Sequence, residues 1–279
     1  MTIGITGASG FVGRALSARL GKAGHQVRPI SLRAALPADA LAGVDAVVHL
    51  AGEPVAQRWT ADARARILSS RVEGTRALVD AMRVHRVQAM VSASAVGYYG
   101  SRGDDVLTES EPAAPDFLGQ VAQAWERGAM QAEPLGVRVT RVRIGMVLGA
   151  NGGALQKMLP PFRLGLGGPI GGGQQWMSWI HMDDLLSLME FLLRESTVRG
   201  VFNAVAPFPV TNAEFTRALA EAVHRPAILP VPAFAVKMLF GEMAEIVLGS
   251  QRAIPDAAAR SGFTFAHADV FGALEQVLK

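Results

Sequence analysis

A glycine turn near the start of the sequence has the spacing of a phosphate-binding loop. Residues 6–13 read TGASGFVG, directly after an apolar run and before a stretch of helical period. Gly7 permits a tight turn, Gly10 lets the backbone approach a pyrophosphate, and Gly13 lets the helix pack closely on the strand. The start of that helix supplies unpaired N–H groups for the anion. An ordinary glycine-rich turn is the alternative, but the register of strand, turn and helix favours dinucleotide binding. The predicted contacts are Gly7, Ser9, Gly10, Phe11, Val12 and Gly13.

The charges that follow the turn favour NADP over NAD. About twenty positions after such a turn, an Asp or Glu would bind the adenosine ribose hydroxyls and repel a 2′-phosphate. The first acidic residue of this chain is Asp39, whereas five Arg or Lys residues precede it, the last being Arg33 just past the second predicted strand. A guanidinium at that place can bind the phosphate through two hydrogen bonds. The alternative is that Arg33 is a solvated loop residue.

Four polar residues are candidates for proton transfer: Ser94, Tyr98, Tyr99 and Arg71. A predicted strand ending at Ala93 puts the first three, in SASAVGYYG, at the carboxyl edge of the sheet, where ligands of parallel α/β folds bind. A phenol of pKa about 10 transfers a proton poorly at neutral pH unless a nearby cation favours the phenolate. Arg71 is the candidate for that cation. The alternative is that Tyr98 or Tyr99 is structural and packs beneath the glycine loop.

The elements that must position these residues follow from the alternation of apolar runs with stretches of helical period. This pattern predicts an α/β fold with a doubly wound parallel sheet of the Rossmann type. The predicted strands are 2–6, 26–31, 45–50, 87–93, 137–144 and 200–205. The predicted helices are 60–84 with Thr60 as N-cap, about 117–133, Asp183 to about Glu195 with Asp183 or Asp184 as cap, 233–248 and about 268–278.

The chain is predicted to divide into a cofactor domain and a smaller lobe. Residues 1–150, completed by about 181–205, form the predicted dinucleotide-binding domain. Residues 151–180 and 206–279 form a smaller C-terminal substrate lobe. Residues 165–173 contain six glycines in nine and are predicted to be either a lid that closes over a ligand or a plain connector.

Composition excludes several classes of protein. Lys plus Arg number 27 against 24 Asp plus Glu, which is too even for a face built to bind nucleic acid. The absence of cysteine excludes disulfides and thiolate metal sites and fits a reducing compartment. The six histidines never have the spacing that places two on one helix face, so no metal site is predicted; His49 is interpreted as a satisfied buried histidine. With no apolar run of about 18 residues, we expect no membrane segment and a soluble, cytoplasmic protein. The sequence makes no prediction of oligomeric state.

Several segments carry a resemblance to a known family: TGASGFVG, HLAGEPV, SASAVGYYG, MLPPFRLGLGGPIGGGQQWMSWIHMDD and the tail GEMAEIVLGSQRAIP. Together they resemble the atypical extended short-chain dehydrogenase/reductases, and within these the NAD(P)-dependent epimerase-like proteins with a C-terminal domain of unknown function. The resemblance spans nearly the whole chain, and it implies a fold and a cofactor more firmly than a reaction. It also implies cofactor contacts at Leu50, Ala51 and Gly52. The third strand–helix unit of such folds is predicted to be truncated, because only about a dozen residues separate the second predicted strand from DAVVHL.

The resemblance also shows where the usual catalytic residues are missing. In that superfamily a Ser or Thr, a Tyr and a Lys four residues later, often with an Asn, relay the substrate proton. Here Ser94 matches the Ser, but Leu118 stands at the Tyr position, Ala122 at the Lys position and Arg71 at the Asn position. The segment DFLGQVAQAWE, residues 116–126, is therefore predicted to be a structural helix start with a hydrocarbon face.

Two functions remain open at this point. The first is an NADP-dependent oxidoreductase or epimerase-like enzyme that acts on a small metabolite of the sugar-nucleotide type. The second is a non-catalytic NADP-binding or redox-sensing protein that has lost the Tyr–Lys pair. Both hypotheses require cofactor binding, so only turnover separates them.

Overall fold

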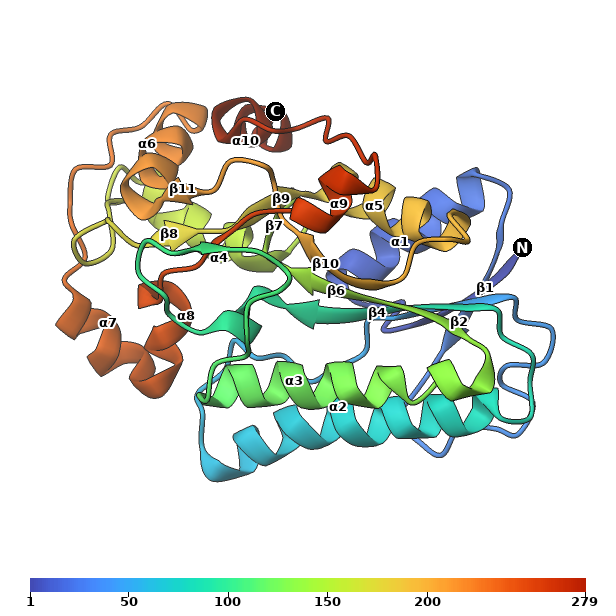
Figure 1. Ribbon diagram of the computed structural model, residues 1–279. Helices are drawn as coiled ribbons and strands as arrows, with labels where there is room; N and C mark the ends of the chain where they lie inside the picture. The colour runs from blue at the N-terminus through green and yellow to red at the C-terminus, as the bar shows by residue number, and fades with distance from the viewer.

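The six predicted strands pair into one parallel sheet in the computed structural model, which describes residues 1–279 (Figure 1). Across the sheet they are β10 (Gly200–Ala204), β6 (Arg138–Ile144), β4 (Ala89–Ala95), β3 (Ala46–His49), β1 (Thr2–Thr6) and β2 (Gln26–Ile30). The chain passes from β2 back across β1 to β3, so the strand order reverses between β1 and β3. Ligands of open α/β sheets bind at such a reversal. The predicted fold class is confirmed.

Helices cover both faces of this sheet (Figure 1). On one face α1 (Phe11–Lys22) packs beside α5 (Met182–Arg194), and on the other α2 (Ala61–Met82) lies along α3 (Phe117–Met130). Each face buries its own apolar cluster, one around Ile3, Ile5 and Leu16 and one around Val47, Leu78 and Met90. Burial on both faces explains why the strand segments are almost continuously apolar.

The link between β2 and β3 is short, as predicted. Residues 31–45 contain no helix, and only Leu41 and Val44 from this link are buried in the core. The chain therefore returns to the sheet without covering the end of β2, and it leaves the loop after β2 exposed.

The remaining elements lie outside the main sheet. They are β5 (Val106–Leu107), β7 (Met146–Leu148), α4 (Gly153–Arg163), β8 (Trp176–Met177), β9 (Trp179–His181), β11 (Val210–Thr211), α6 (Asn212–Ala222), α7 (Ala233–Phe240), α8 (Glu245–Leu248), β12 (Arg252–Ala253), α9 (Asp256–Arg260) and α10 (Val270–Leu278). A third apolar cluster, which includes Trp179, Phe215 and Leu274, joins β9, α6 and α10. In contrast, α9 packs in the cluster around Ile3, and β5 and β12 pack with Tyr99 in a small separate cluster. The domain boundaries given above stay a prediction.

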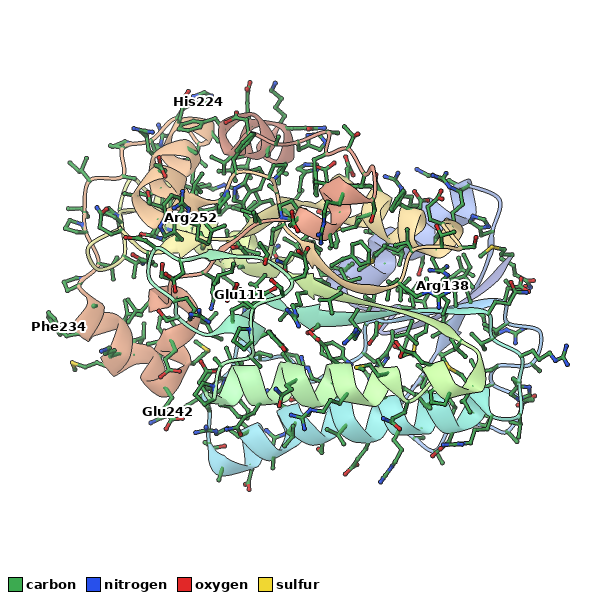
Figure 2. The ribbon with its side chains drawn as sticks, in the orientation of Figure 1. Glu111, Arg138, His224, Phe234, Glu242 and Arg252 are labelled. Atoms are coloured by element: carbon green, nitrogen blue, oxygen red, sulfur yellow. The ribbon has the colours of Figure 1, made fainter.

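Two local predictions were wrong. The helix expected over 233–248 is interrupted after α7, because Gly241 adopts a φ of +58° that ends the helix, and the chain continues through a short 3₁₀ turn into α8. Phe234, in α7, and Glu242, in the 3₁₀ turn after it, are labelled at the left of Figure 2. The cap of α5 is His181, not Asp183 or Asp184, because His181 Nδ1 accepts the Asp183 N–H at 3.1 Å.

The glycine-rich segment is a connector held to its neighbours. Leu229 donates to the Gly167 carbonyl, Val231 donates to the Pro169 carbonyl, and Gly171 donates back to Val231. A Cβ at Gly168 would lie 1.9 Å from the Leu229 oxygen, so only glycine fits there. These bonds favour the connector interpretation over the lid.

The end of α5 is fixed by a side chain from the sheet. The Arg138 guanidinium, labelled in Figure 2, donates to the carbonyls of Leu192, Leu193 and Val198. The carbonyls of Leu192 and Leu193 belong to the last turn of α5 and would otherwise lack partners. Among the helices of the chain, none combines the length and apolar character needed to cross a bilayer.

Candidate functional site

The glycine turn has the geometry that the sequence predicted. Gly7 has a φ of +69°, and its carbonyl accepts the Gly10 N–H at 2.9 Å. A Cβ on Gly13 would lie 2.1 Å from the Gly7 oxygen, so α1 can approach β1 this closely only with glycine at that position. No side chain caps the first turn of α1, and both Ser9 and Gly10 are exposed. The N–H groups of Phe11 and Val12 at this terminus are available to an anion.

The second predicted cofactor segment lies directly beside this turn. The Thr6 hydroxyl accepts the N–H groups of Leu50 at 3.1 Å and Ala51 at 3.2 Å, which joins the ends of β1 and β3. A Cβ on Gly7 would lie 2.9 Å from the Leu50 carbonyl carbon. The turn and residues 50–52 thus line the same edge of the sheet, at the reversal of strand order.

Arg33 lies exposed in the loop after β2. Its guanidinium makes no hydrogen bond or ion pair within the chain, and only its backbone N–H contacts Ser31, at 3.4 Å. A free guanidinium at the end of β2 is where the sequence placed the group that would bind a 2′-phosphate.

Ser94 lies at one end of a buried polar network that the sequence did not reveal. Its hydroxyl donates to Glu126 Oε1 at 2.7 Å. The same carboxylate pairs with Arg143, whose Nε and Nη2 donate at 2.8 and 3.0 Å. Asn203 ends the network by accepting a hydrogen bond from the Tyr99 hydroxyl at 2.7 Å. Because both charges of the Glu126–Arg143 pair are buried, each depends on the other for its stability.

The two tyrosines have different environments. Tyr99 is fully buried, and its hydroxyl accepts from Arg143 and donates to Asn203. Burial raises the pKa of Tyr99 to about 12, so this phenol is a poor proton donor and acceptor at neutral pH. Tyr98 is half-buried, its ring lies under the Arg143 guanidinium at 3.4 Å, and its hydroxyl has no partner in the chain. Of the two candidates, Tyr98 keeps a hydroxyl that a ligand can use.

Arg71 does not join this network. Its guanidinium donates to the carbonyls of Glu53 at 3.0 Å and Ile67 at 3.1 Å, and it stacks on Trp125 at 4.7 Å. A Cβ on Gly52 would lie 2.9 Å from its guanidinium carbon. Burial lowers the pKa of Arg71 to about 10, while Glu53 opposes that shift. These contacts give Arg71 the role of tying residues 52–53 to α2.

The predictions for the other singled-out residues agree with the structure. Asp116 caps α3 by accepting the Gly119 N–H at 2.7 Å, so DFLGQVAQAWE is a helix start. Ala122 is buried, and Leu118 packs against Gly97. His49 is a satisfied buried histidine: Nδ1 pairs with the Thr6 hydroxyl at 2.7 Å and Nε2 with Thr75 at 2.9 Å.

The aromatic residues after the connector are structural. Trp179 is fully buried and donates to the Phe208 carbonyl at 3.1 Å. Trp176 donates to Asp104 at 2.8 Å, and Arg252, labelled in Figure 2, lies over its ring at 4.1 Å. Neither tryptophan is positioned to close over the cofactor edge.

Comparisons with known proteins assign this chain to a family. Residues 3–204 match the NAD dependent epimerase/dehydratase family, and residues 231–277 match a domain of unknown function, DUF1731. The chain belongs to the NAD dependent epimerase/dehydratase family. These matches confirm the family resemblance found in the sequence. They also confirm that a C-terminal domain of unknown function comes after the epimerase/dehydratase part of the chain.

Three relatives place the chain more closely within the epimerase/dehydratase family. It is 39% identical to the chloroplastic epimerase family protein SDR39U1 homolog of Arabidopsis thaliana, over 100% of this chain and 87% of the relative. It is 35% identical to human epimerase family protein SDR39U1, solved with NADPH, with a TM-score of 0.92 over 100% of this chain and 99% of the other. It is 34% identical to a nucleoside-diphosphate sugar epimerase from Corynebacterium glutamicum, with a TM-score of 0.82, and covers 58% of that longer chain. The NADPH of the human protein agrees with the cofactor predicted for this family member.

Proposed function

We propose that this protein binds NADP(H) across the carboxyl ends of β1 and β3 and transfers hydride to or from a small metabolite. The observation that carries the proposal is the uncapped start of α1 on the Gly7–Gly13 turn, with the unpaired Arg33 guanidinium in the exposed loop after β2. Together they offer N–H groups for a pyrophosphate and a cation for a 2′-phosphate. The NADPH found with the human relative supports this choice of cofactor.

The residues of the chain fit the cofactor in three places. The N–H groups at Ser9 to Val12 would bind the pyrophosphate, Leu50 to Gly52 would line the opposite wall, and Arg33 would bind the 2′-phosphate. The bound cofactor supplies or accepts the hydride. We also propose that the protein is located in the cytoplasm, because a chain without cysteine suits a reducing compartment.

The substrate would lie near Ser94, because β4 ends there at the same edge of the sheet. The Ser94 proton is directed to Glu126, so Ser94 is arranged to accept a hydrogen bond from a substrate hydroxyl. The free Tyr98 hydroxyl is the group that can exchange a proton with the substrate oxygen. The Arg143 guanidinium lies over the Tyr98 ring and holds it in place at this edge of the sheet. Tyr99 and Arg71 keep positioning roles in this proposal.

The substrate class we propose is a carbonyl or secondary alcohol of the sugar-nucleotide type, in keeping with the Corynebacterium relative. The test is turnover of NADPH and NADP⁺ with a panel of nucleoside-diphosphate sugars, ketones and secondary alcohols. We expect a substrate within the panel, and the Tyr98→Phe variant should lower its turnover by about 10²- to 10⁴-fold. Arg33→Ala should raise the KM for NADPH and leave kcat nearly unchanged.

A second function is favoured by one specific observation. The α3 face that presents Tyr and Lys in related enzymes presents Leu118 and the buried Ala122 here. A chain with that face is also suited to be a non-catalytic NADP-binding or redox-sensing protein. Binding without turnover across the panel supports this second function, especially if Leu118→Tyr combined with Ala122→Lys creates reductase activity.

A further inference from the structure

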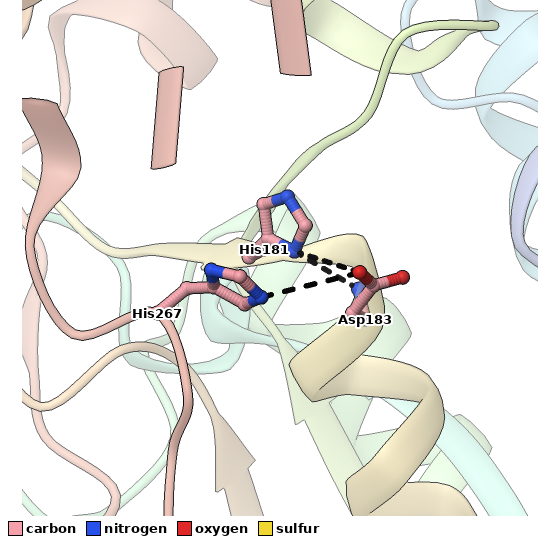
Figure 3. Close-up of side chains that lie close together, drawn as sticks. All are labelled: His181, Asp183 and His267. Atoms are coloured by element: carbon pink, nitrogen blue, oxygen red, sulfur yellow. Dashed lines mark hydrogen bonds and ion pairs between the residues drawn. The ribbon is translucent and has the colours of Figure 1, made fainter. Parts of the chain in front are cut away.

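Three potential metal ligands lie together where α5 begins, away from the Ser94 network (Figure 3). Asp183 Oδ2 lies 3.9 Å from His181 Nδ1 and 3.9 Å from His267 Nε2. One ligand atom from each residue lies within 4.8 Å of the other two. Two imidazoles and one carboxylate are the donor set of open zinc sites. The sequence did not reveal this group, because His181 and His267 are far apart in the chain.

The two histidines are brought together by a buried carboxylate. Asp184, almost fully buried, accepts the backbone N–H of Ala266 and that of His267, each at 2.9 Å. This fixes the segment before α10 against the first turn of α5. The two imidazole rings lie 3.9 Å apart by their centroids, tilted by 37°. The cluster is therefore preorganised by the fold and does not depend on a chance contact of surface side chains.

The mobility and spacing of the ligands also suit a cation. The Asp183 carboxylate is 56% exposed, so it can move toward a bound ion. In a tetrahedral zinc site, bonds of about 2.0 Å place ligand atoms roughly 3.3 Å apart, so the ligand atoms, now within 4.8 Å of one another, must move closer by up to about 1.5 Å.

A cavity of about 470 Å³ gives access to the cluster. His181 and Asp183 line it together with Phe11, Arg14 and Asn151. An ion held by three protein ligands would keep one or more positions open toward this cavity, where water or a small anion could bind. The cavity also adjoins the start of α1, so the site lies behind the glycine turn and is separate from Ser94.

We propose that His181, Asp183 and His267 form a binding site for a divalent transition metal ion of the zinc class. Magnesium and calcium are excluded as preferred ions, because both favour oxygen ligands. The metal must displace the Asp183 N–H from His181 Nδ1, where it now caps α5. Loss of that cap should weaken binding by roughly fivefold. The proposal does not depend on the function proposed above.

The test uses the full-length protein without a histidine tag, treated with a chelator and dialysed free of it, in the absence of cofactor. Isothermal titration with ZnCl₂ should give one site per chain. CoCl₂ should give the visible absorption bands of four- or five-coordinate cobalt. Zinc should also raise the melting temperature, because it binds the folded state.

Matched variants decide whether these residues bind the ion. His267→Gln and Asp183→Asn should each weaken zinc binding by about 10-fold or more, whereas His224→Asn, at an exposed histidine on the far end of α6 (Figure 2), should leave it unchanged. Circular dichroism without metal verifies that each variant is folded. The use of two independent ligand variants keeps the test decisive if one of them fails to fold. The proposal is overturned if the folded wild-type protein binds no zinc, or if a folded ligand variant binds it as tightly as the wild type.

Discussion

Glu126 and Arg143 form a buried ion pair between α3 and β6, with Arg143 Nε 2.8 Å from Oε1 and Nη2 3.0 Å from Oε2. Ser94 and Tyr99 each donate to or accept from one member of the pair. The pair therefore holds in place the carboxyl end of β4 and the 3₁₀ turn that follows it, Val96–Tyr99. We expect that removal of the pair lowers the free energy of unfolding of the protein, whether or not it affects the reaction.

Glu126→Gln tests this pair. The amide keeps the shape of the side chain but leaves the Arg143 charge without its partner, which costs about 3–5 kcal/mol in buried pairs. We expect the free energy of unfolding, measured by urea titration, to fall by at least about 3 kcal/mol. Glu133→Gln, at an exposed glutamate in the 3₁₀ turn after α3, should change it by less than about 0.5 kcal/mol. Equal effects of the two substitutions would show that the pair contributes no special stability.

Substitution of the two tyrosines by phenylalanine should have different effects on the free energy of unfolding. Tyr99→Phe removes a hydroxyl that Arg143 and Asn203 both use, and leaving these buried groups unsatisfied costs about 1–3 kcal/mol. Tyr98→Phe keeps the ring under Arg143 and removes a hydroxyl with no partner, so stability should stay within about 0.5 kcal/mol. Urea titration of both variants measures the difference. A larger loss for Tyr98→Phe than for Tyr99→Phe would reverse the roles assigned to them.

His49 should make stability depend on pH. Burial, and next the charge of Arg71, lower the pKa of His49 to about 3, whereas an unfolded histidine titrates near 6.5. Between these values the unfolded chain binds one more proton, so stability rises with pH in this window. The contribution of His49 is complete above about pH 6.5 and is lost as pH falls toward 3, by about 1.4 kcal/mol per pH unit.

The variant His49→Gln checks this sign and slope. The free energy of unfolding, measured by urea titration between about pH 5 and 6.5, should depend less on pH in this variant than in the wild type. The slope should fall by up to about 1.4 kcal/mol per pH unit. His224→Asn, at an exposed position, should keep the wild-type slope. An unchanged slope in His49→Gln means that His49 is not the buried neutral group.

Three glycines, Gly10 at the N-cap of α1 and Gly13 and Gly21 within it, should respond differently to substitution by alanine. At Gly13 the new Cβ would meet the Gly7 oxygen at 2.1 Å, so the fold should be strongly destabilised. At Gly10 the contact is 3.1 Å, so the fold should survive, but the methyl group would occupy the anion site and abolish most of the thermal shift caused by NADPH. At Gly21, next to last in α1, nothing lies within 4 Å, and alanine should stabilise by up to about 1 kcal/mol. Differential scanning fluorimetry with and without NADPH compares all three, and a full NADPH shift in Gly10→Ala places the pyrophosphate elsewhere.

The parts of the fold that sequence could predict are those encoded by local patterns. The six strands alternate with helical stretches, and Gly7, Gly10 and Gly13 have a spacing that only one kind of turn requires. Thr60 and Asp116 stand directly before helical periods, and both cap their helices in the structure. Each of these features depends on neighbours within a few residues, so it can be read without tertiary contacts.

The features that escaped prediction depend on contacts between distant residues. Glu126 and Arg143 lie on different elements, and nothing in their local sequence marks them as a pair. Asn203 joins Tyr99 only because β10 and the 3₁₀ turn after β4 meet in space. The break at Gly241 was missed because its apolar neighbours on both sides continue the helical pattern. Of the predicted catalytic residues, Ser94 and Tyr99 share one network, Tyr98 packs against it, and Arg71 lies apart.

The most direct test of the account is the affinity of the protein for the two nicotinamide cofactors. Isothermal titration of the wild type with NADPH and with NADH should show tighter binding of NADPH. Arg33→Ala should remove a charge-assisted contact worth about 1.5–3 kcal/mol, which lowers NADPH affinity by about one to two decades and leaves NADH unchanged. Lys22→Ala, at an exposed cation near the end of α1, should change neither affinity. Equal affinities for the two cofactors, or NADPH affinity unaffected by Arg33→Ala, would contradict the assignment of NADP to this site.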